Sequence, residues 1–563
     1  MPSAIESTVT AVKTACVARL AAMAMVAMVA MSVSVSGCAN LPQHVHRPVT
    51  TAYSQPERTP LGGLVQARRG TSRSTSGFAL LDGVESAYTA RMALIAAARQ
   101  TLDLQYYAVH ADGTTEQMLQ ALRDAARRGV RVRILLDDFN TSGRNAQVLR
   151  LGFEPQVELR LFNPLMGSRA SMLSRIISSL GNLQRLQQRM HNKLFIADNA
   201  MGITGGRNLG DSYFGFGVAS NFVDLDVLAA GSVVRDMSRS FDQYWNNPQA
   251  YPVQSLTTLA QLDALKDDAS TLSQNPASAQ KSVAPSGMAE LALTAADTVV
   301  PDMTVTSAFA DVPLNLQRLT LTWAPATLMV DKADKISADQ DDEPDAQDTL
   351  IDGVLQLMDT ARKDLLIVSP YFVPGERMLR AFAVIRARGV RVRVLTNSLA
   401  STDAPIAHAG YARYRERLLA MGVELFEMRS TPSGGLGIFG SSGNSRLSGS
   451  TLGSSRASLH SKALVVDSRL AVIGSMNLDL RSQLQNTEVA LVIRSAAMAA
   501  AITGHIERTL GSGAYRLELG KRGLVWRSPD QANFPDDTDE PGVTVGLNLL
   551  VRVLGPLAPE EML

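Results

Sequence analysis

The sequence predicts an α/β protein in which one domain occurs twice. The segment RRGVRVRILL (127–136) returns as RARGVRVRVL (386–395). In both places an apolar run is followed by an amphipathic helical pattern, a glycine and an alternating strand pattern. A strand–helix–strand order favours a parallel sheet with a right-handed crossover. Duplication of a whole α/β domain explains both copies, and 563 residues are enough for two.

The N-terminal segment is expected to be a targeting signal outside the fold. A basic flank precedes the apolar run 20–35, which is shorter than the roughly 20 residues of a membrane-spanning helix. The run ends at Val-Ser-Gly-Cys, which resembles the bacterial lipoprotein signal, so residues 1–37 would be removed and Cys38 lipidated. An ordinary signal peptide and an uncleaved anchor are the alternatives. Residues 38–75 are rich in Pro, Thr, Arg and Gly without helical or strand periodicity, which is typical of a tether.

The two domains are expected at 76–250 and 346–563, the second with a C-terminal tail. Each contains an apolar strand pattern ahead of the repeated helical pattern, LDLQYYAV (102–109) in the first and DLLIVSPYFV (364–373) in the second. The helical patterns that follow have matching apolar faces, made of Met118, Leu119, Leu122 and Ala125 in one copy and Met378, Leu379, Phe382 and Ile385 in the other. All four pairs of apolar residues keep the same offset of 260 residues.

Three further segments have less regular patterns. Residues 251–345 are expected to link the halves, with a low-complexity stretch at 273–287 and an acidic one at 333–348. The Gly/Ser-rich run 434–456 leads into the second motif and is interpreted as a mobile lid or a tolerated insertion. The run 172–190 is amphipathic, and a core-facing helix and a helix lying on an anionic membrane are both open.

The halves also share a polar motif. HNKLFIAD (191–198) and HSKALVVD (460–467) both have the form H-x-K-x4-D. Each is followed at one fixed distance by Gly-x-x-Asn, ending at Asn208 and Asn477, and then by an acidic residue in a strand-like run, Asp224 and Glu488. Two matching copies of so many polar positions indicate chemistry and not chance.

Strand alternation explains the spacing within the motif. Residues i and i+2 of a strand point to one face, so the imidazole and the ammonium project together. Two copies facing each other would supply two His, two Lys and two Asn around one centre. Four donors for nonbridging oxygens, one imidazole to attack phosphorus and one to protonate the leaving oxygen suit a phosphodiester.

These motifs resemble the phospholipase D superfamily, in which paired HKD motifs form one active site. The stretches RMHNKLFIADN, GGRNLGDSYFG, SPYFVPGE and STDAPIAHAGYARYRERLL are similar to the bacterial cardiolipin synthase C type. The resemblance implies two α/β/α sandwich domains packed as a pseudo-dimer, with the active site between them and a phosphohistidine intermediate. It also implies order in LTLTWAPATLMVDKAD (319–334), because a similar segment recurs in the family.

The resemblance assigns a role to each motif residue. The catalytic set is His191, Lys193, Asp198, His460, Lys462 and Asp467. His191 would be the nucleophile and His460 the general acid and then base, although the order could be reversed. The lysines, Asn208 and Asn477 would hold phosphate oxygens, and Asp224 and Glu488 would orient the imidazoles. Asp198 and Asp467 are expected to be structural more than chemical.

The sequence leaves several activities open. A phosphatidyltransferase that makes cardiolipin from glycerophospholipids is favoured, with a hydrolytic phospholipase D as the chief alternative, because both share the phosphohistidine. A phosphodiesterase or nuclease is less favoured, since the net charge of +1 gives no field to recruit nucleic acid. A non-catalytic scaffold is disfavoured by two intact motifs. No cofactor and no metal are expected, because no Cys/His or carboxylate cluster has ligand spacing.

Partners and location follow from the anchor and the substrate class. Phospholipid substrates and membrane attachment through Cys38 are expected, and the sequence does not indicate a protein partner. Ala39 differs from the Asp retention signal of inner-membrane lipoproteins, which favours an outer-membrane anchor facing the periplasm.

Overall fold

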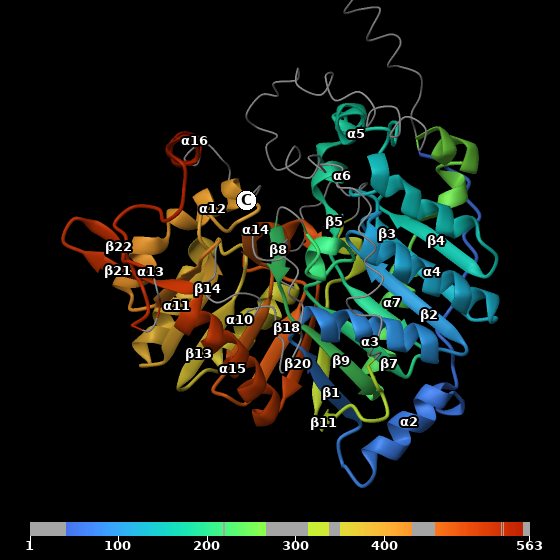
Figure 1. The fold of residues 1–563 in the computed structure, drawn as a ribbon, viewed down its shortest axis with the longest axis horizontal. Coiled ribbons are helices and arrows are strands. Elements are labelled where there is room, and N and C mark those ends of the chain that lie inside the picture. Colours follow the sequence, from blue (N-terminus) through green and yellow to red (C-terminus); the bar gives the residue numbers. More distant parts are fainter. Residues whose placement is uncertain are drawn as a thin grey trace, which may run out of the picture.

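Two nine-stranded sheets form the centre of the computed structural model (Figure 1). The structure describes residues 41–217, 220–265, 314–336, 349–430, 456–530, 532 and 534–554. Both sheets have the same strand order, which confirms the duplicated α/β domain. In the first it is β4 (Val157–Phe162), β3 (Arg131–Asp137), β2 (Thr101–Tyr106), β6 (Leu194–Ala197), β7 (Met201–Gly205), β9 (Asp226–Gly231) and β1 (Ser76–Leu81). In the second it is β15 (Glu424–Met428), β14 (Arg391–Asn397), β13 (Asp364–Val368), β17 (Ala463–Val466), β18 (Leu470–Gly474), β20 (Val489–Arg494) and β12 (Ala326–Val330).

The repeated segments form the predicted strand–helix–strand units. Helix α4 (Gly113–Arg127) joins β2 to β3, and α11 (Gly375–Ala387) joins β13 to β14, with both strand pairs parallel. Gly129 and Gly389 follow the helices with φ of 92° and 79°, a left-handed conformation that glycine adopts without strain. The carboxyl ends of the parallel strands β2 and β3 lie at one edge of the first sheet, and those of β13 and β14 at one edge of the second. The loops that follow these ends are therefore close together, which is where functional residues often lie.

Helices cover both faces of each sheet. Helix α3 (Val84–Ala97) and α4 pack on the outer face of the first sheet, and α10 (Leu350–Asp359), α11 and α13 (Arg415–Ala420) on that of the second. Helices α7 (Ser232–Trp245) and α15 (Ala496–Ser512) share one apolar cluster with strands of both sheets. The expected α/β/α layers and pseudo-dimeric packing are therefore present, and Figure 1 shows the halves side by side.

The remaining strands extend the edges of the sheets. Strands β10 (Ala250–Pro252) and β11 (Thr322–Trp323) complete the first sheet, and β21 (Ala514–Gly520) and β22 (Gly523–Arg527) complete the second. None of the helices in the described part of the chain is long and apolar enough to cross a membrane.

The structure corrects the expected linker between the halves. The predicted linker 251–345 contains β12, which pairs with β20 as β1 pairs with β9. The second half therefore starts before residue 346. Order in 319–334 is confirmed by β11 and β12, which pair with β1 and β20 respectively. Strand β12 has only five residues and its flanking sequence has no clear pattern, so its periodicity was too short to predict it. Its pairing with β20 is what shows that it belongs to the second half.

The described part of the expected tether is also more regular than its composition suggests. Helix α2 (Pro60–Arg69) starts at a Thr59 cap and buries Leu61 and Val65. Gly62 lies so close to Pro56 that a Cβ there would be 1.8 Å from its carbonyl oxygen. Two adjacent glycines weaken the helical signal of this stretch, yet the first of them is what allows the close packing. Residues 1–40, including Cys38, and the segments 266–313, 337–348 and 431–455 lie outside the described residues.

Candidate active site

Two short strand pairs bring the motifs of the two halves together. Strand β5 (Arg189–Met190) runs parallel to β19 (Asn486–Thr487), and β16 (Arg456–Leu459) runs parallel to β8 (Ser220–Val223). Each pair joins one half to the other. The register opposes Met190 to Thr487 and Leu459 to Val223. The next residues along the paired chains are therefore His191 beside Glu488 and His460 beside Asp224.

Each imidazole contacts the carboxylate of the opposite half. His191 Nδ1 lies 3.0 Å from both carboxylate oxygens of Glu488, and His460 Nδ1 lies 2.6 Å from Asp224 Oδ2. Because Nδ1 is engaged in both rings, Nε2 is the nitrogen left for chemistry. The crossed contacts make one centre that neither half can form alone. The sequence located both carboxylates without indicating this exchange.

The surroundings of the two carboxylates differ at one matched position of the Gly-x-x-Asn segments. Ser475 donates its hydroxyl to Glu488, as does Ser482 at 2.9 Å. The first segment has Gly206 at the position of Ser475, and a Cβ there would lie 2.2 Å from Asp224 Oδ1. Glycine is needed there because the carboxylate occupies the space of a side chain. The sequence analysis missed this contrast between Gly-Gly-Arg-Asn and Gly-Ser-Met-Asn.

The motif lysines lie just ahead of β6 and β17, so the H-x-K residues precede the strands in which they were expected. Lys193 Nζ donates to His191 O at 2.8 Å, and Lys462 Nζ donates to His460 O at 2.7 Å. Among the described residues neither ammonium has a carboxylate ion-pair partner. Burial lowers the pKa of Lys193 to about 7 and that of Lys462 to about 8. The charges of Glu488 and Asp224 raise both pKa values but only partly offset burial, so an anionic phosphodiester would further stabilise the two ammonium groups.

The two histidine–carboxylate pairs differ in charge preference. Burial raises the pKa of Glu488 to about 7, and burial and Lys193 hold the pKa of His191 well below its usual value. At Asp224, burial is outweighed by His460 and Lys462, so its pKa is lowered. Asp224 therefore remains an anion and can stabilise an imidazolium at His460. The pKa of His460 is nevertheless lowered to about 4, because burial and Lys462 outweigh Asp224.

The motif asparagines are buried at the same centre. Asn208 accepts from the Ala108 backbone at 3.3 Å and donates to the Tyr213 hydroxyl at 3.0 Å, which fixes its amide. Asn477 is buried, and its Oδ1 has no hydrogen-bond partner among the described residues. The Asn208 amide is therefore engaged within the fold, while Asn477 has an unpartnered side-chain oxygen.

Asp198 and Asp467 lie apart from the imidazoles. Asp198 accepts from the backbone N–H groups of residues 99–101, and Asp467 from those of residues 362–364. Both have left-handed backbone, with φ of 53° and 50°. They stabilise the turn after β6 or β17 and the entry to β2 or β13. The geometry therefore agrees with the structural role that was expected for them.

Replacing Asp198 or Asp467 by Ala should reduce stability and leave the chemistry of the folded protein nearly unchanged. Each change removes several hydrogen bonds to backbone N–H groups and places Ala in left-handed backbone, so a loss of about 1–3 kcal/mol is expected. Denaturant unfolding measures the stability, and turnover per folded molecule is measured at low temperature. A variant of unchanged stability that had lost most of its turnover would contradict the structural role.

Aromatic side chains that sequence reasoning missed surround both imidazoles. Tyr107 lies edge-on to His191 with ring centroids 5.1 Å apart, and Tyr213 and Phe222 lie 5.4 and 5.0 Å from the His460 ring. Tyr107 follows β2, within the loops that the parallel-strand edge carries. Three histidines outside the motif contact neighbours within the fold: His110 contacts Tyr213, His408 contacts Arg415 and His505 contacts Asp82.

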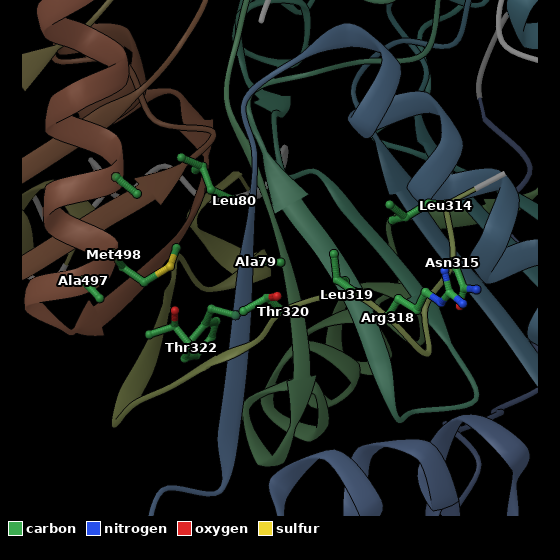
Figure 2. Close-up of a pocket in the computed structure, with 12 residues that line it drawn as sticks. Ala79, Leu80, Leu314, Asn315, Arg318, Leu319, Thr320, Thr322, Ala497 and Met498 are labelled. Carbon is green, nitrogen blue, oxygen red and sulfur yellow. The ribbon is translucent and has the colours of Figure 1, made fainter. Parts of the chain in front are cut away.

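One cavity is separate from this centre. This cavity has a volume of about 510 Å³ and lies between β1, the segment 314–322 and α15. Figure 2 shows Leu80, Arg318 and Met498 among its lining side chains. None of the motif residues lines it. The catalytic centre is therefore identified by its side chains and not by this cavity.

The lowered pKa values of the lysines predict an alkaline limb in the pH profile. Lys193 and Lys462 lose their charge as pH rises through about 7 and 8 in the free protein. Because kcat/KM reports groups of the free enzyme, it should fall through this range for an anionic diester, while kcat should fall at higher pH. A kcat/KM that stayed flat to about pH 10, where ordinary lysines titrate, would contradict the cationic role.

Comparisons with known proteins agree with this geometry. A family model described as "Cardiolipin synthase, PLD-like domain" matches residues 92–245 and 354–510. Cardiolipin synthase C of Escherichia coli (strain K12) is 34% identical over 484 residues, which are 85% of this chain and 94% of that protein. Cardiolipin synthase A of Pseudomonas entomophila (strain L48) is 25% identical over 426 residues, 75% of this chain and 65% of that protein.

A solved structure shares the fold. Phosphatidylserine synthase of Haemophilus influenzae Rd KW20 aligns with a TM-score of 0.54 at 11% identity, over 89% of this chain and all of that one. At this identity the likeness concerns the fold alone. The family model covers more than half of the chain in two separate matches, one in each half, and each match contains one H-x-K motif. The chain therefore belongs to the cardiolipin synthase family of phospholipase D-like domain proteins.

Proposed function

We propose that this protein is a phosphatidyltransferase that makes cardiolipin or a related phospholipid. The observation that carries the proposal is the single centre with two imidazoles, each held by a carboxylate of the other half, and two buried ammonium groups between the halves. The similarity to a cardiolipin synthase over most of both chains supports the phospholipid substrate.

The proposed reaction has two displacements at phosphorus. In the first, His191 Nε2 attacks the phosphodiester, the bond to the headgroup oxygen breaks, and His460 gives its proton to that oxygen. The phosphatidyl group is then on His191. In the second, His460 takes the proton of the acceptor hydroxyl, the new phosphorus–oxygen bond forms, and the bond to His191 breaks. Lys193, Lys462 and the two asparagines hold the nonbridging oxygens throughout.

The electrostatics support this order of roles. A nucleophilic imidazole must be neutral, and the pKa of His191 is held well below its usual value beside a Glu488 whose pKa is about 7. A general acid must carry a proton; the pKa of His460 is about 4 in the free protein because of burial and Lys462, and the anionic Asp224 is the neighbour that raises it. A bound diester anion would further favour the imidazolium.

The identity of the product tests transfer against hydrolysis. Purified protein is incubated with labelled phosphatidylglycerol or phosphatidylethanolamine, and the lipid products are separated. Cardiolipin is the expected product. Phosphatidic acid alone would assign water as the acceptor and hence a phospholipase D, and inert lipid with cleaved DNA would assign a nuclease.

A carboxylate beside the acid supports an alcohol acceptor. Asp403 accepts from the Tyr371 hydroxyl at 2.8 Å through Oδ2, while its buried Oδ1 has no partner among the described residues. Its charge raises the pKa of His460 against the larger effect of burial. A free carboxylate oxygen at this position can accept a hydrogen bond from a hydroxyl of a glycerol headgroup.

Asp403→Asn should therefore impair transfer more than phosphoenzyme formation. The expected result is a KM for the alcohol acceptor raised by about 10-fold, as for the loss of one charged hydrogen bond, with little change in the release of a nitrophenyl leaving group, which needs no proton from His460. Acceptor titration with a fixed donor measures both quantities, and Tyr371→Phe is the matched control for loss of the Tyr–Asp contact. An unchanged acceptor KM would exclude the contact.

We also propose attachment to a membrane facing the periplasm through a lipidated Cys38, with the outer membrane favoured. The Val-Ser-Gly-Cys sequence supports this. In Cys38→Ala, the shift in gel mobility caused by the lipid should disappear and the membrane-bound share should fall. Unchanged mobility and partitioning would reject the lipoprotein assignment.

A further inference from the structure

Helix α5 (Met172–Ser179) is inverted relative to an ordinary surface helix. Its charged residue Arg175 is fully buried in an ion pair with Asp138, which also binds Arg169 at 2.6 Å. The apolar side chains Leu173, Ile177 and Leu180 are instead 52%, 53% and 55% exposed. The buried side of α5 thus carries Arg175 beside Ile176 and Ser179, while most of its apolar side chains and Leu180 at its C-cap face outward.

Helix α16 (Val545–Leu554) in the other half has a similar exposed stripe. Val545, Leu549 and Val553 are 86%, 62% and 57% exposed and lie four residues apart, on one face of the helix. Isolated exposed apolar residues are common, but two stripes of three on two helices are not explained by composition alone.

The exposed stripe of α5 is held at the carboxyl end of β3, which also contacts the residue before His191. Asp138, which holds α5, directly follows β3. Its neighbour Asp137 accepts from the backbone N–H of Met190 at 2.8 Å, one residue before His191.

The second stripe is anchored at the equivalent place in the other half. Asn397, the last residue of β14, bonds both backbone groups of Leu459, one residue before His460. Helix α12 (Pro405–Ala412) follows this strand end, and α16 packs on it. Glu540, ahead of α16, is paired with Arg415. Figure 1 shows α5 and α16 at the same end of the molecule, one in each half.

The N-terminal chain enters at this end as well. Arg47 donates to Ala250 O at 3.2 Å, and Ala250 is paired with Phe162 at the carboxyl end of β4. Six residues later, the carbonyl of Tyr53 accepts from Asn199, next to the structural Asp198 at the opposite edge. Residues 47–53 therefore run from the edge that carries α5 to the opposite edge.

We propose that α5 and α16 dock the protein on a phospholipid bilayer, with both apolar stripes inserted and the catalytic centre between them facing the lipid. The proposal rests on the proposed function in requiring a bilayer substrate. A bilayer fits two separate stripes on one end, because it contacts both at once and supplies the substrate there. A protein that spanned both stripes would cover the centre between them.

Fluorescent labels at single introduced cysteines test the docking without relying on turnover. A polarity-sensitive fluorophore is attached to three full-length single variants, Ile177→Cys, Leu549→Cys and Val384→Cys. The labelled proteins are then bound to vesicles of phosphatidylglycerol and phosphatidylethanolamine. The parent protein gives the background of its two cysteines. Val384 is the matched control, since it is 55% exposed but lies near the end of α11 that leads to the amino end of β14.

Labels at 177 and 549 should be quenched by doxyl-labelled phospholipid and protected from aqueous iodide, and the label at 384 should behave in the opposite way. Iodide access at either stripe on bound protein would overturn the proposal. So would protection from both quenchers, which would assign the stripes to a protein partner or a second copy. None of these readings depends on whether the lipid product is cardiolipin.

A kinetic comparison separates docking from chemistry. The double variant Ile177→Gln, Leu549→Gln should lose at least about 10-fold in rate on vesicles, while its rate on a soluble short-chain diester should equal that of the parent. Val384→Gln should match the parent on both substrates. Equal losses on both substrates, or no loss on vesicles, would overturn the proposal.

Discussion

Removing either motif histidine should abolish turnover, and removing both should cost little more. His191→Ala and His460→Ala are each expected to lower kcat by at least about 10³-fold, because groups that act as one unit are not additive. The reason is geometric: each ring contacts the carboxylate of the other half, so both belong to one centre. Steady-state kinetics on the two single variants and the double variant measure this coupling.

The single variants should also differ in kind. With a nitrophenyl phosphodiester, whose leaving group needs no proton, His460→Ala should still form a phosphoenzyme and His191→Ala should not. Acid-stopped, labelled protein shows the difference. The reverse pattern would exchange the two roles. Retention of about half the activity by each single variant would contradict a shared centre and indicate two independent sites.

Replacing a carboxylate should impair the same reaction step as replacing the histidine that it contacts in the opposite half. Glu488→Gln and Asp224→Asn keep the shape of the side chain but remove its charge, and each is expected to cost about 10²- to 10⁴-fold in kcat, as for an imidazole-orienting carboxylate. Asp224→Asn should impair the step that needs the acid, so it should behave like His460→Ala with the nitrophenyl donor. Glu488→Gln should impair formation of the phosphoenzyme, like His191→Ala.

The pH dependence gives this prediction a second readout. Because the pKa of Glu488 is raised to about 7, its carboxyl is largely neutral below that pH in the free protein. The cost of Glu488→Gln on kcat/KM should therefore shrink as pH falls below 7. Asp224 has a lowered pKa, so the cost of Asp224→Asn should be constant over the same range. If each carboxylate instead paired with the histidine of its own half, Asp224→Asn would behave like His191→Ala and Glu488→Gln like His460→Ala, which would contradict the crossed pairs.

The residue types of the centre were predictable from the sequence. The pairing of each histidine with the carboxylate of the other half was not. The H-x-K spacing places imidazole and ammonium together because of the extended backbone, and the duplication indicates two such sets. The pairing of His191 with Glu488 depends on the register of β5 against β19, two residues each. Strands this short have no periodicity to detect, and their partners are almost 300 residues away in sequence.

Long periodic segments were predicted well and packing-dependent ones were not. Helix α4 and strand β3 follow directly from the apolar spacing at 113–137. Helix α5 shows the limit of such patterns, because a helix with apolar residues on one face does not have to bury that face. The ion pair of Arg175 with Asp138 reverses the usual orientation, and it depends on a tertiary contact with the end of β3.

The most direct test of a single centre built by both halves is the stoichiometry of the covalent intermediate. The parent protein, which retains both motif histidines, is treated with a radiolabelled nitrophenyl phosphodiester, stopped in the first turnovers, and mapped by peptide mass. The account predicts about one labelled group per chain, on the peptide that contains His191. Two labelled groups per chain, or a label on a peptide without His191, would contradict it.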